Sequence, residues 1–304
     1  MHQYKLSGYL FTAPAVLLMV LILIVPIAVA FFFSFTDYSL GNRSFNWVGV
    51  ENYEKLIGKR TYNKMIYASV TYVIIVVPIS MALGLGAALL INSIKCLGDF
   101  YKTIYFLPVM AALLAMAIVW EFTLHPTIGS INQSLSNLCG TYFEVFAWVK
   151  NGCTKSFPLW LGDKAYALPT ICFIGIWQAF GFNMVLYLAG LTSIPRELYQ
   201  AAEIDGAAAN WSSFTLVTWP MLGPTTVFVV TITTIRSFQV FDTVEALTLG
   251  GPVKSTYVLM YAIFEKAIQQ NLVGIGSAIT VVFIIFVMFL TFLQRYAVEK
   301  RVHY

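Results

Sequence analysis

The sequence predicts an all-α membrane protein with six transmembrane helices. Of its 304 residues, 59% are hydrophobic and only 11% are charged, whereas a soluble domain carries roughly a quarter charged residues. The mean hydropathy is +0.77. The apolar runs are continuous instead of alternating. This pattern favours helices over a barrel, because each helix satisfies its own backbone hydrogen bonds within the bilayer.

Six apolar runs approach or exceed the length of about 20 residues that a helix needs to cross a bilayer. The expected spans are Leu10–Phe35, Ile66–Ile91, Thr103–Phe122, Leu168–Leu191, Met221–Val240 and Gly274–Leu293.

The first run follows Lys5, as a signal peptide would, but we expect it to be a retained span. It is too long for a signal peptide, contains Pro14 and Pro26, and ends without a small-residue cleavage site. An even number of spans places both termini on one side. Basic residues are spread nearly evenly over the two sides, so charge bias alone does not orient the chain. The net charge of +4 indicates no nucleic-acid partner.

Motifs for metal, nucleotide or catalysis are missing from the sequence. No Cys/His cluster has metal-ligand spacing, and no Ser, His and acid arrangement indicates an enzyme. The stretch "LGGPVKST" has the composition of a phosphate loop, but Pro252 and Val253 stand where glycine should precede the lysine. We therefore expect no cofactor in this chain. Cys139 and Cys153 share one long loop, and a disulfide between them is left open.

The stretch "QAAEIDGAAAN" interrupts the apolar sequence between the fourth and fifth spans. Pro195 suits a helix start, and Gly206 suits a helix end. The segment therefore predicts a short helix with a small-residue face, and an ordinary solvated loop is the alternative. The residues of interest are Gln200, Ala201, Ala202, Glu203, Asp205, Gly206 and Ala207.

"QAAEIDGA" followed by "VTWP" resembles the EAA loop of the integral membrane subunits of binding-protein-dependent ABC importers. The resemblance extends along nearly the whole chain and is closest to carbohydrate-importer permeases related to the maltose and glycerol-3-phosphate systems. The further stretches that carry it are "YLFTAPAVLL", "SFTDY", "WVGVENYEKL", "YFLPVMAALLAMAIVWEFTL", "GSINQSL", "SFQVFDTVEALTLGGPVKSTYVLMYAIFEKAI" and "GIGSAIT".

This resemblance implies a subunit that forms half of a pathway for a sugar or oligosaccharide. Its partners would be a second permease, identical or different, two ATP-binding subunits that hold ATP and Mg, and an extracytoplasmic solute-binding protein. It also implies a multi-pass protein of a bacterial or archaeal cytoplasmic membrane, with both termini and the coupling helix in the cytoplasm. Residues 1–304 would form a single permease domain, with the first span and an extracytoplasmic loop in 1–65 and a five-helix core in 66–294.

Two positions depart from the family pattern in the loop. Gln200 stands where the family has Glu, and Trp219 replaces a Leu. In the family this Glu is expected to meet a basic surface on the ATPase. Glu203 lies at i+3 from Gln200 and shares its helix face, so it could supply the missing charge.

Polar side chains in the fourth and fifth spans predict the pathway. In the fifth span Thr226, Thr233 and Ser237 fall on one stripe at helical spacing, with Arg236 close by. Aromatic rings stack on sugar faces and amides bond sugar hydroxyls, although a membrane Thr is often bonded to its own backbone. Arg236 offers donors to an acidic saccharide, or else forms a structural pair with Asp242 or Glu245 or extends to the interface. The candidates are Trp177, Gln178, Asn183, Tyr187, Thr226, Thr233, Arg236 and Ser237.

The alternative function is an ion-coupled secondary transporter. Such a protein would be expected to show acids within its spans and inverted repeats. Here Glu121 and Asp242 fall at span ends, so the sequence favours the importer subunit.

Overall fold

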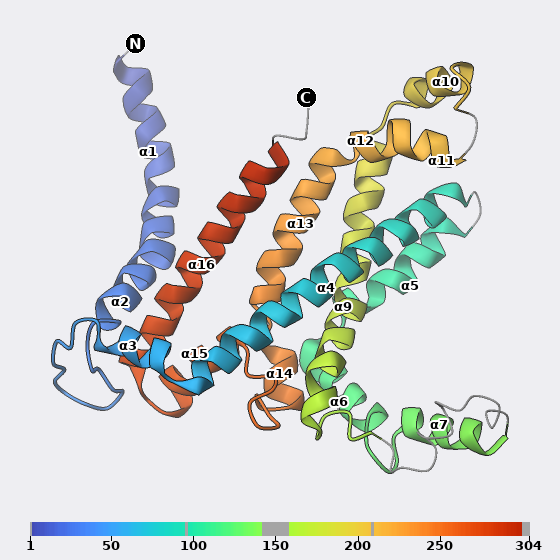
Figure 1. Ribbon diagram of the computed structural model, residues 1–304. Coiled ribbons are helices and arrows are strands. Elements are labelled where there is room, and N and C mark those ends of the chain that lie inside the picture. Colours follow the sequence, from blue (N-terminus) through green and yellow to red (C-terminus); the bar gives the residue numbers. More distant parts are fainter. Residues whose placement is uncertain (1, 95–96, 142–157, 208–209, 300–304) are drawn as a thin grey trace. The chain divides into compact units, whose positions relative to one another are not determined.

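The computed structural model describes residues 2–94, 97–141, 158–207 and 210–299 (Figure 1). Within these residues the chain is helical and has no β-strand, apart from an isolated antiparallel bridge between Thr36 and Trp47. The predicted all-α class is therefore confirmed. The first half contains α1 (His2–Met19), η1 (Val20–Ile24), α2 (Val25–Phe33), α3 (Glu51–Gly58), α4 (Arg60–Ser93), α5 (Gly98–Met110), α6 (Leu113–Thr123) and α7 (Ser130–Thr141). The second half contains α9 (Lys164–Thr192), α10 (Arg196–Ile204), α11 (Asn210–Ser213), η2 (Phe214–Thr218), α12 (Trp219–Met221), α13 (Gly223–Phe238), α14 (Asp242–Leu247), α15 (Leu259–Phe264), η3 (Glu265–Gln269) and α16 (Val273–Glu299).

Among the described residues, five helices are long and apolar enough to cross a membrane. They are Phe11–Phe33, Arg60–Ser93, Lys164–Thr192, Gly223–Leu247 and Val273–Leu293. The remaining run expected to span, Thr103–Phe122, is not one helix. It divides into α5 and α6, which pass the same test together but are bent by 96°. Ala111 and Ala112 are extended and interrupt the helical hydrogen-bond ladder between them.

The described residues contain three π-helical turns that the sequence did not predict, and two of them are followed by a proline. The π-helical turn η1 includes Ile22, four residues before Pro26, and η2 includes Leu216, four residues before Pro220. A proline ring clashes with the carbonyl four residues earlier and supplies no N–H to it. A π turn widens the helix at that carbonyl, so both helices continue through their prolines.

The chain divides into two compact units, Met1–Asn63 with Ala262–Phe286 and Lys64–Tyr261 with Val287–Tyr304. In the first unit, the loop after α2 is fixed by the buried Asn52 side chain. Its Nδ2 donates to the carbonyl oxygens of Ser34 at 2.9 Å and Thr36 at 2.8 Å. The rings of Phe35 and Trp47 stack with centroids 5.5 Å apart, so the loop is ordered by specific contacts.

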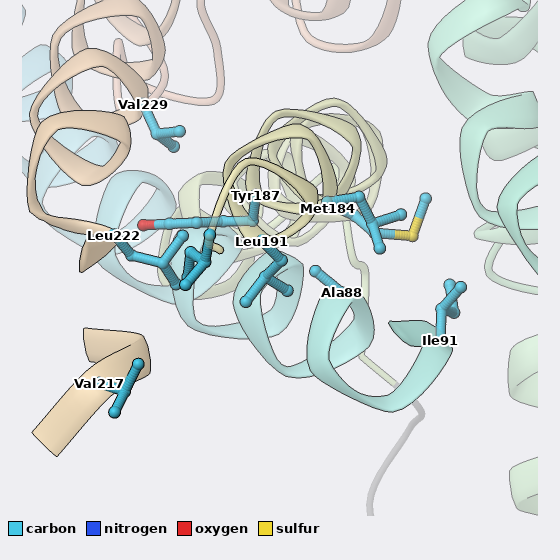
Figure 2. Close-up of a cluster of buried hydrophobic side chains, with 10 residues drawn as sticks. Ala88, Ile91, Met184, Tyr187, Leu191, Val217, Leu222 and Val229 are labelled. Atoms are coloured by element: carbon cyan, nitrogen blue, oxygen red, sulfur yellow. The ribbon is translucent and has the colours of Figure 1, made fainter. Parts of the chain in front are cut away.

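In the second unit, α9 packs against α5 and α13. Glycine makes the approach to α13 possible, since a Cβ at Gly190 would lie 2.6 Å from Thr225 Oγ1. Lipid tails are as apolar as these side chains, so close packing holds such helices together. The central hydrophobic cluster, part of which Figure 2 labels, comprises Ala88, Ile91, Met184, Tyr187, Leu188, Leu191, Ile194, Val217, Leu222 and Val229.

Candidate functional site

A polar cavity of 420 Å³ lies in the second unit, lined by residues of α4, α9 and α13, by the bend between α5 and α6, and by the segment that follows α13. We call it the polar cavity. Five of the eight side chains predicted for the pathway line it, from two different helices. They are Gln178, Asn183, Thr233, Arg236 and Ser237. Thr233 and Ser237, two of the three residues on the predicted stripe of the fifth span, and the nearby Arg236 therefore lie together in space.

Asn183 is the central hydrogen-bonding residue of the polar cavity. Its side chain is fully buried. Its Oδ1 accepts a hydrogen bond of 2.7 Å from Thr233 Oγ1 on α13, and its Nδ2 donates to Ser80 Oγ on α4 at 3.2 Å. A buried amide without partners would cost about 1–3 kcal/mol. These two bonds therefore fix the direction of the amide and join three helices at one residue.

Arg236 is exposed and carries the positive charge of the polar cavity. Its Cζ lies 4.0 Å from the centroid of the Phe182 ring, at cation–π distance. Neither Asp242 nor Glu245, both within the described chain, forms an ion pair with it. Asp242 lines the same cavity. The ring positions the guanidinium while leaving its fork of N–H donors for a planar anionic group.

The other three predicted pathway residues do not line the polar cavity. Tyr187 is 1% exposed and belongs to the central hydrophobic cluster. Trp177 packs edge-on against Trp120 of α6, with ring centroids 5.5 Å apart. Thr226 lies seven residues before Thr233 on the same helix face, about 10 Å along α13, and the cavity does not extend that far.

Sequence reasoning missed several residues of the polar cavity. Phe182 and Tyr72 are aromatic residues within apolar spans, and nothing in the sequence distinguishes them from packing residues. The Tyr72 hydroxyl occupies the space that a Cβ at Gly175 would need. Gln239 also lines the cavity. It stands at i+3 from Arg236, so continuing the polar stripe by one turn would have found it.

The segment 200–207, which we call the coupling segment, forms the end of α10 and its cap. Gly206 has a φ of +87°, a backbone region that favours glycine. The N–H of Ala207 donates to Ala202 O at 2.8 Å and that of Gly206 to Glu203 O at 3.1 Å. This pair of bonds is the Schellman ending of a helix. The segment therefore forms the predicted short helix with its cap, and not the alternative, an ordinary solvated loop.

The side chains of α10 face two ways. Ala202 and Tyr199 pack against the central hydrophobic cluster, and the Tyr199 hydroxyl lies 3.1 Å from Thr218 Oγ1. Ala207 is also buried. Ile204 is 87% exposed, an apolar surface residue that the sequence analysis overlooked. The other exposed members of the coupling segment are Gln200, Ala201, Glu203, Asp205 and Gly206.

The coupling segment and the polar cavity occupy different levels of the second unit. Helix α10 follows the Thr192 end of α9, whereas α6 and α14 lie toward its Lys164 end (Figure 1). Asn183 lies between these two ends. The cavity and α10 are thus connected by the C-terminal part of one continuous helix. The Cys139–Cys153 pair lies outside the side chains that the structure describes.

Comparisons with known proteins show the family of the chain. The chain is 29% identical over 301 residues to the sn-glycerol-3-phosphate transport system permease protein UgpA of Agrobacterium fabrum, covering 99% of this chain and 97% of that protein. It is also 29% identical over 304 residues to the lactose transport system permease protein LacF of Rhizobium radiobacter, covering 99% and 96%.

A solved bacterial ABC transporter involved in the import of the acidic polysaccharide alginate contains a chain of the same fold. The TM-score is 0.78 at 21% identity, and the likeness covers 97% of this chain and 96% of that one. Residues 80–304 match the family described as binding-protein-dependent transport system inner membrane component. The chain thus belongs to the family of inner membrane components of binding-protein-dependent transport systems.

Proposed function

We propose that this chain is the membrane subunit of an ATP-driven importer and forms half of the pathway for a sugar or oligosaccharide. The observation that carries the proposal is the polar cavity, in which amide, hydroxyl and guanidinium groups converge within otherwise apolar spans. Such groups match the hydroxyls of a saccharide, and the Phe182 ring offers an apolar face. Trp177, Tyr187 and Thr226 would then support the pathway from the surrounding packing.

The same proposal assigns a topology. The bent pair α5 and α6 would serve as the third of six spans, and an even number of spans places both termini on one side. With α10 in the cytoplasm, both termini are cytoplasmic as well. The chain 1–304 would then be a single permease domain, with a first span and an extracytoplasmic loop in 1–65 and a five-helix core in 66–294.

Helix α10 would couple this chain to an ATP-binding subunit. Its exposed side offers Ala201 and Gly206, which permit close approach, and Gln200, Glu203 and Ile204, which can contact a partner surface. The packing of Tyr199 and Ala202 against the membrane-spanning helices would carry movement of α10 into them.

The proposed complex contains a second permease, two ATP-binding subunits that hold ATP and Mg, and an extracytoplasmic solute-binding protein. This chain would contribute neither the ATP site nor the initial selection of the sugar.

The charge of Arg236 favours an acidic saccharide as cargo. Among the relatives named above, one carries glycerol-3-phosphate, which is anionic, and one carries lactose, which is neutral. Relatedness therefore does not decide the charge of the substrate. The Arg236 guanidinium, which forms no ion pair with the described acids, does favour an anion.

The proposal is tested by purifying the complete complex from its native host, with a tag on this chain, and reconstituting it in liposomes. We expect uptake of a labelled saccharide to require both ATP and the solute-binding protein. The chain purified alone should neither hydrolyse ATP nor transport. Uptake that is driven by a proton or sodium gradient without ATP would overturn the proposal and favour a secondary transporter.

A further inference from the structure

A second cavity, of 370 Å³, lies between the N-terminal parts of α4 and α9 and the segment 253–255. We call it the lysine cavity, because Lys64, Lys164 and Lys254 all line it. It lies within the second unit and shares no lining residue with the polar cavity. The proposed transport function therefore leaves it without a role.

The lysine cavity is strongly positive. Lys64 Nζ donates to the carbonyl oxygen of Val253 at 2.9 Å, and Lys254 Nζ lies 4.1 Å from the centroid of the Tyr257 ring. A backbone carbonyl orients the Lys64 ammonium group but does not neutralise it. None of the described residues that line the cavity is an Asp or Glu. Three positive charges around one opening therefore attract an anion.

The backbone at the rim is held in an unfavourable conformation. Val253 has a φ of +52° and Lys254 a φ of +61°. Residues other than glycine rarely adopt such values, and β-branched residues such as Val adopt them least often. Such strain persists only where neighbouring contacts impose it, as they do at ligand clamps. The bond from Lys64 to Val253 is one of these contacts, so the fold itself places Lys254 at the cavity.

The wall below the lysines is apolar. It includes Ile75 on α4 and Leu168 and Pro169 on α9. Lys64 and Ile75 are eleven residues apart on one helix, about 16 Å, which matches the half-thickness of the bilayer hydrocarbon, about 15 Å. Tyr67, also in the lining, is 70% exposed, so the wall is open toward the surroundings of the helices.

We infer that the lysine cavity binds an anionic phospholipid, with its phosphate among the three lysines and an acyl chain along the apolar wall. A soluble acidic saccharide fits less well. It needs hydrogen-bond partners over its whole surface, whereas Thr71, Ser255 and the Tyr67 hydroxyl are the only neutral hydroxyl groups among the described lining residues. The inference does not depend on the transport function.

The test is native mass spectrometry of the full-length chain, purified in detergent and titrated with phosphatidylglycerol or phosphatidylcholine. We expect clear preference for phosphatidylglycerol. Each of Lys64→Gln, Lys164→Gln and Lys254→Gln should weaken it about fivefold, and the triple variant about a hundredfold, from the usual contribution of a basic residue near a lipid surface. Affinity for phosphatidylcholine should not change.

A control variant combines Lys55→Gln, Lys59→Gln and Lys102→Gln, which remove three positive charges outside the cavity. It should bind phosphatidylglycerol as the wild type does. The variant Ala165→Trp fills the cavity without altering any charge. The Ala165→Trp variant should no longer bind phosphatidylglycerol. It provides a second test if the triple lysine variant does not fold. Equal binding of both lipids, or competition by glycerol phosphate or a uronate trisaccharide at lipid-like concentrations, would overturn the inference.

Discussion

Thr233 Oγ1 donates a 2.7 Å hydrogen bond to Asn183 Oδ1, which joins α13 to α9 at the wall of the polar cavity. Both residues are buried. Each was predicted from the sequence as a pathway residue, and the structure shows that they contact one another. A residue in this position contributes both to the shape of the cavity and to the packing of the helices.

Replacing Thr233 with Val should destabilise the chain by about 1 kcal/mol, because it leaves Asn183 Oδ1 without its donor. The measurement is unfolding of the purified chain in mixed detergent micelles. Thr231→Val is the matched control on the same helix, since the Thr231 hydroxyl bonds only the backbone oxygen of Val227, at 2.9 Å. Equal loss of stability in the two variants would show that the bond to Asn183 contributes nothing specific.

Replacing Arg236 with Gln should lower uptake of an acidic saccharide by at least tenfold while changing uptake of its neutral analogue by less than threefold, because a charge-assisted bond is lost. Arg236→Lys should retain part of the activity, since it keeps the charge but not the planar fork. Uptake in liposomes at matched protein levels is the measurement. If both substrates lose uptake equally, Arg236 has only a structural role.

Gly206→Val should reduce transport more strongly than ATP hydrolysis, because it adds a side chain on the proposed docking face. A Cβ there would meet nothing within 4 Å inside this chain, so the obstruction would lie toward the partner. The φ of +87° adds backbone strain for Val. Gly206→Asn separates the two causes, since Asn tolerates this conformation better. Normal coupling in the Asn variant would leave strain as the only effect.

Glu203→Gln should weaken association with the ATP-binding subunit by about two- to fivefold, the usual range for an exposed ion pair. Adding Gln200→Glu should restore it, because the two positions share one face. Glu197→Gln, in the first turn of the same helix, is the charge-matched control. Association is measured by titrating the labelled ATP-binding subunit. An unaltered affinity in the single variant would remove Glu203 from the contact.

Asp37 should make the loop after α2 sensitive to acid. The pKa of its carboxyl is lowered from 3.8, first by the backbone N–H of Asn46 at 2.6 Å and then by the Asn46 side chain at 3.0 Å. A lowered pKa in the folded state means that the carboxylate stabilises the loop above about pH 4 and that this stabilisation is lost as the pH falls further. The melting temperature of the wild type should exceed that of Asp37→Asn at pH 6. The two should converge as the pH falls below 3.8 and through the lowered pKa of Asp37, and a difference that does not change with pH would contradict the assignment.

The sequence predicted the all-helical class because apolar runs of this length have few other solutions in a bilayer. It also predicted much of the polar cavity, since Thr233 and Ser237 fall on one helical stripe. It did not predict that Thr226, on the same stripe, lies beyond the cavity, because periodicity gives the face of a helix and not the depth of a cavity. Nor did it reveal the lysine cavity, whose three lysines stand far apart in the chain.

The bend between α5 and α6 was not predicted either, because hydropathy does not report the extended backbone conformation of Ala111 and Ala112. The exposed Ile204 was missed for a related reason. From sequence alone, an apolar residue in a short amphipathic helix such as Ile204 is expected to pack against neighbouring helices. In α10, Tyr199 and Ala202 make that contact, and Ile204 faces outward.

Helix α9 is continuous from Asn183 to Thr192, so this part of the chain would move as one rigid segment. Nine residues of helix measure about 14 Å, so a tilt of about 10° applied at the α10 end displaces Asn183 by about 2.4 Å. That displacement is close to the length of the bond to Thr233, so the bond breaks unless α13 tilts in step. A tilt at α10 therefore preserves the bond between Asn183 and Thr233 only if α9 and α13 move together.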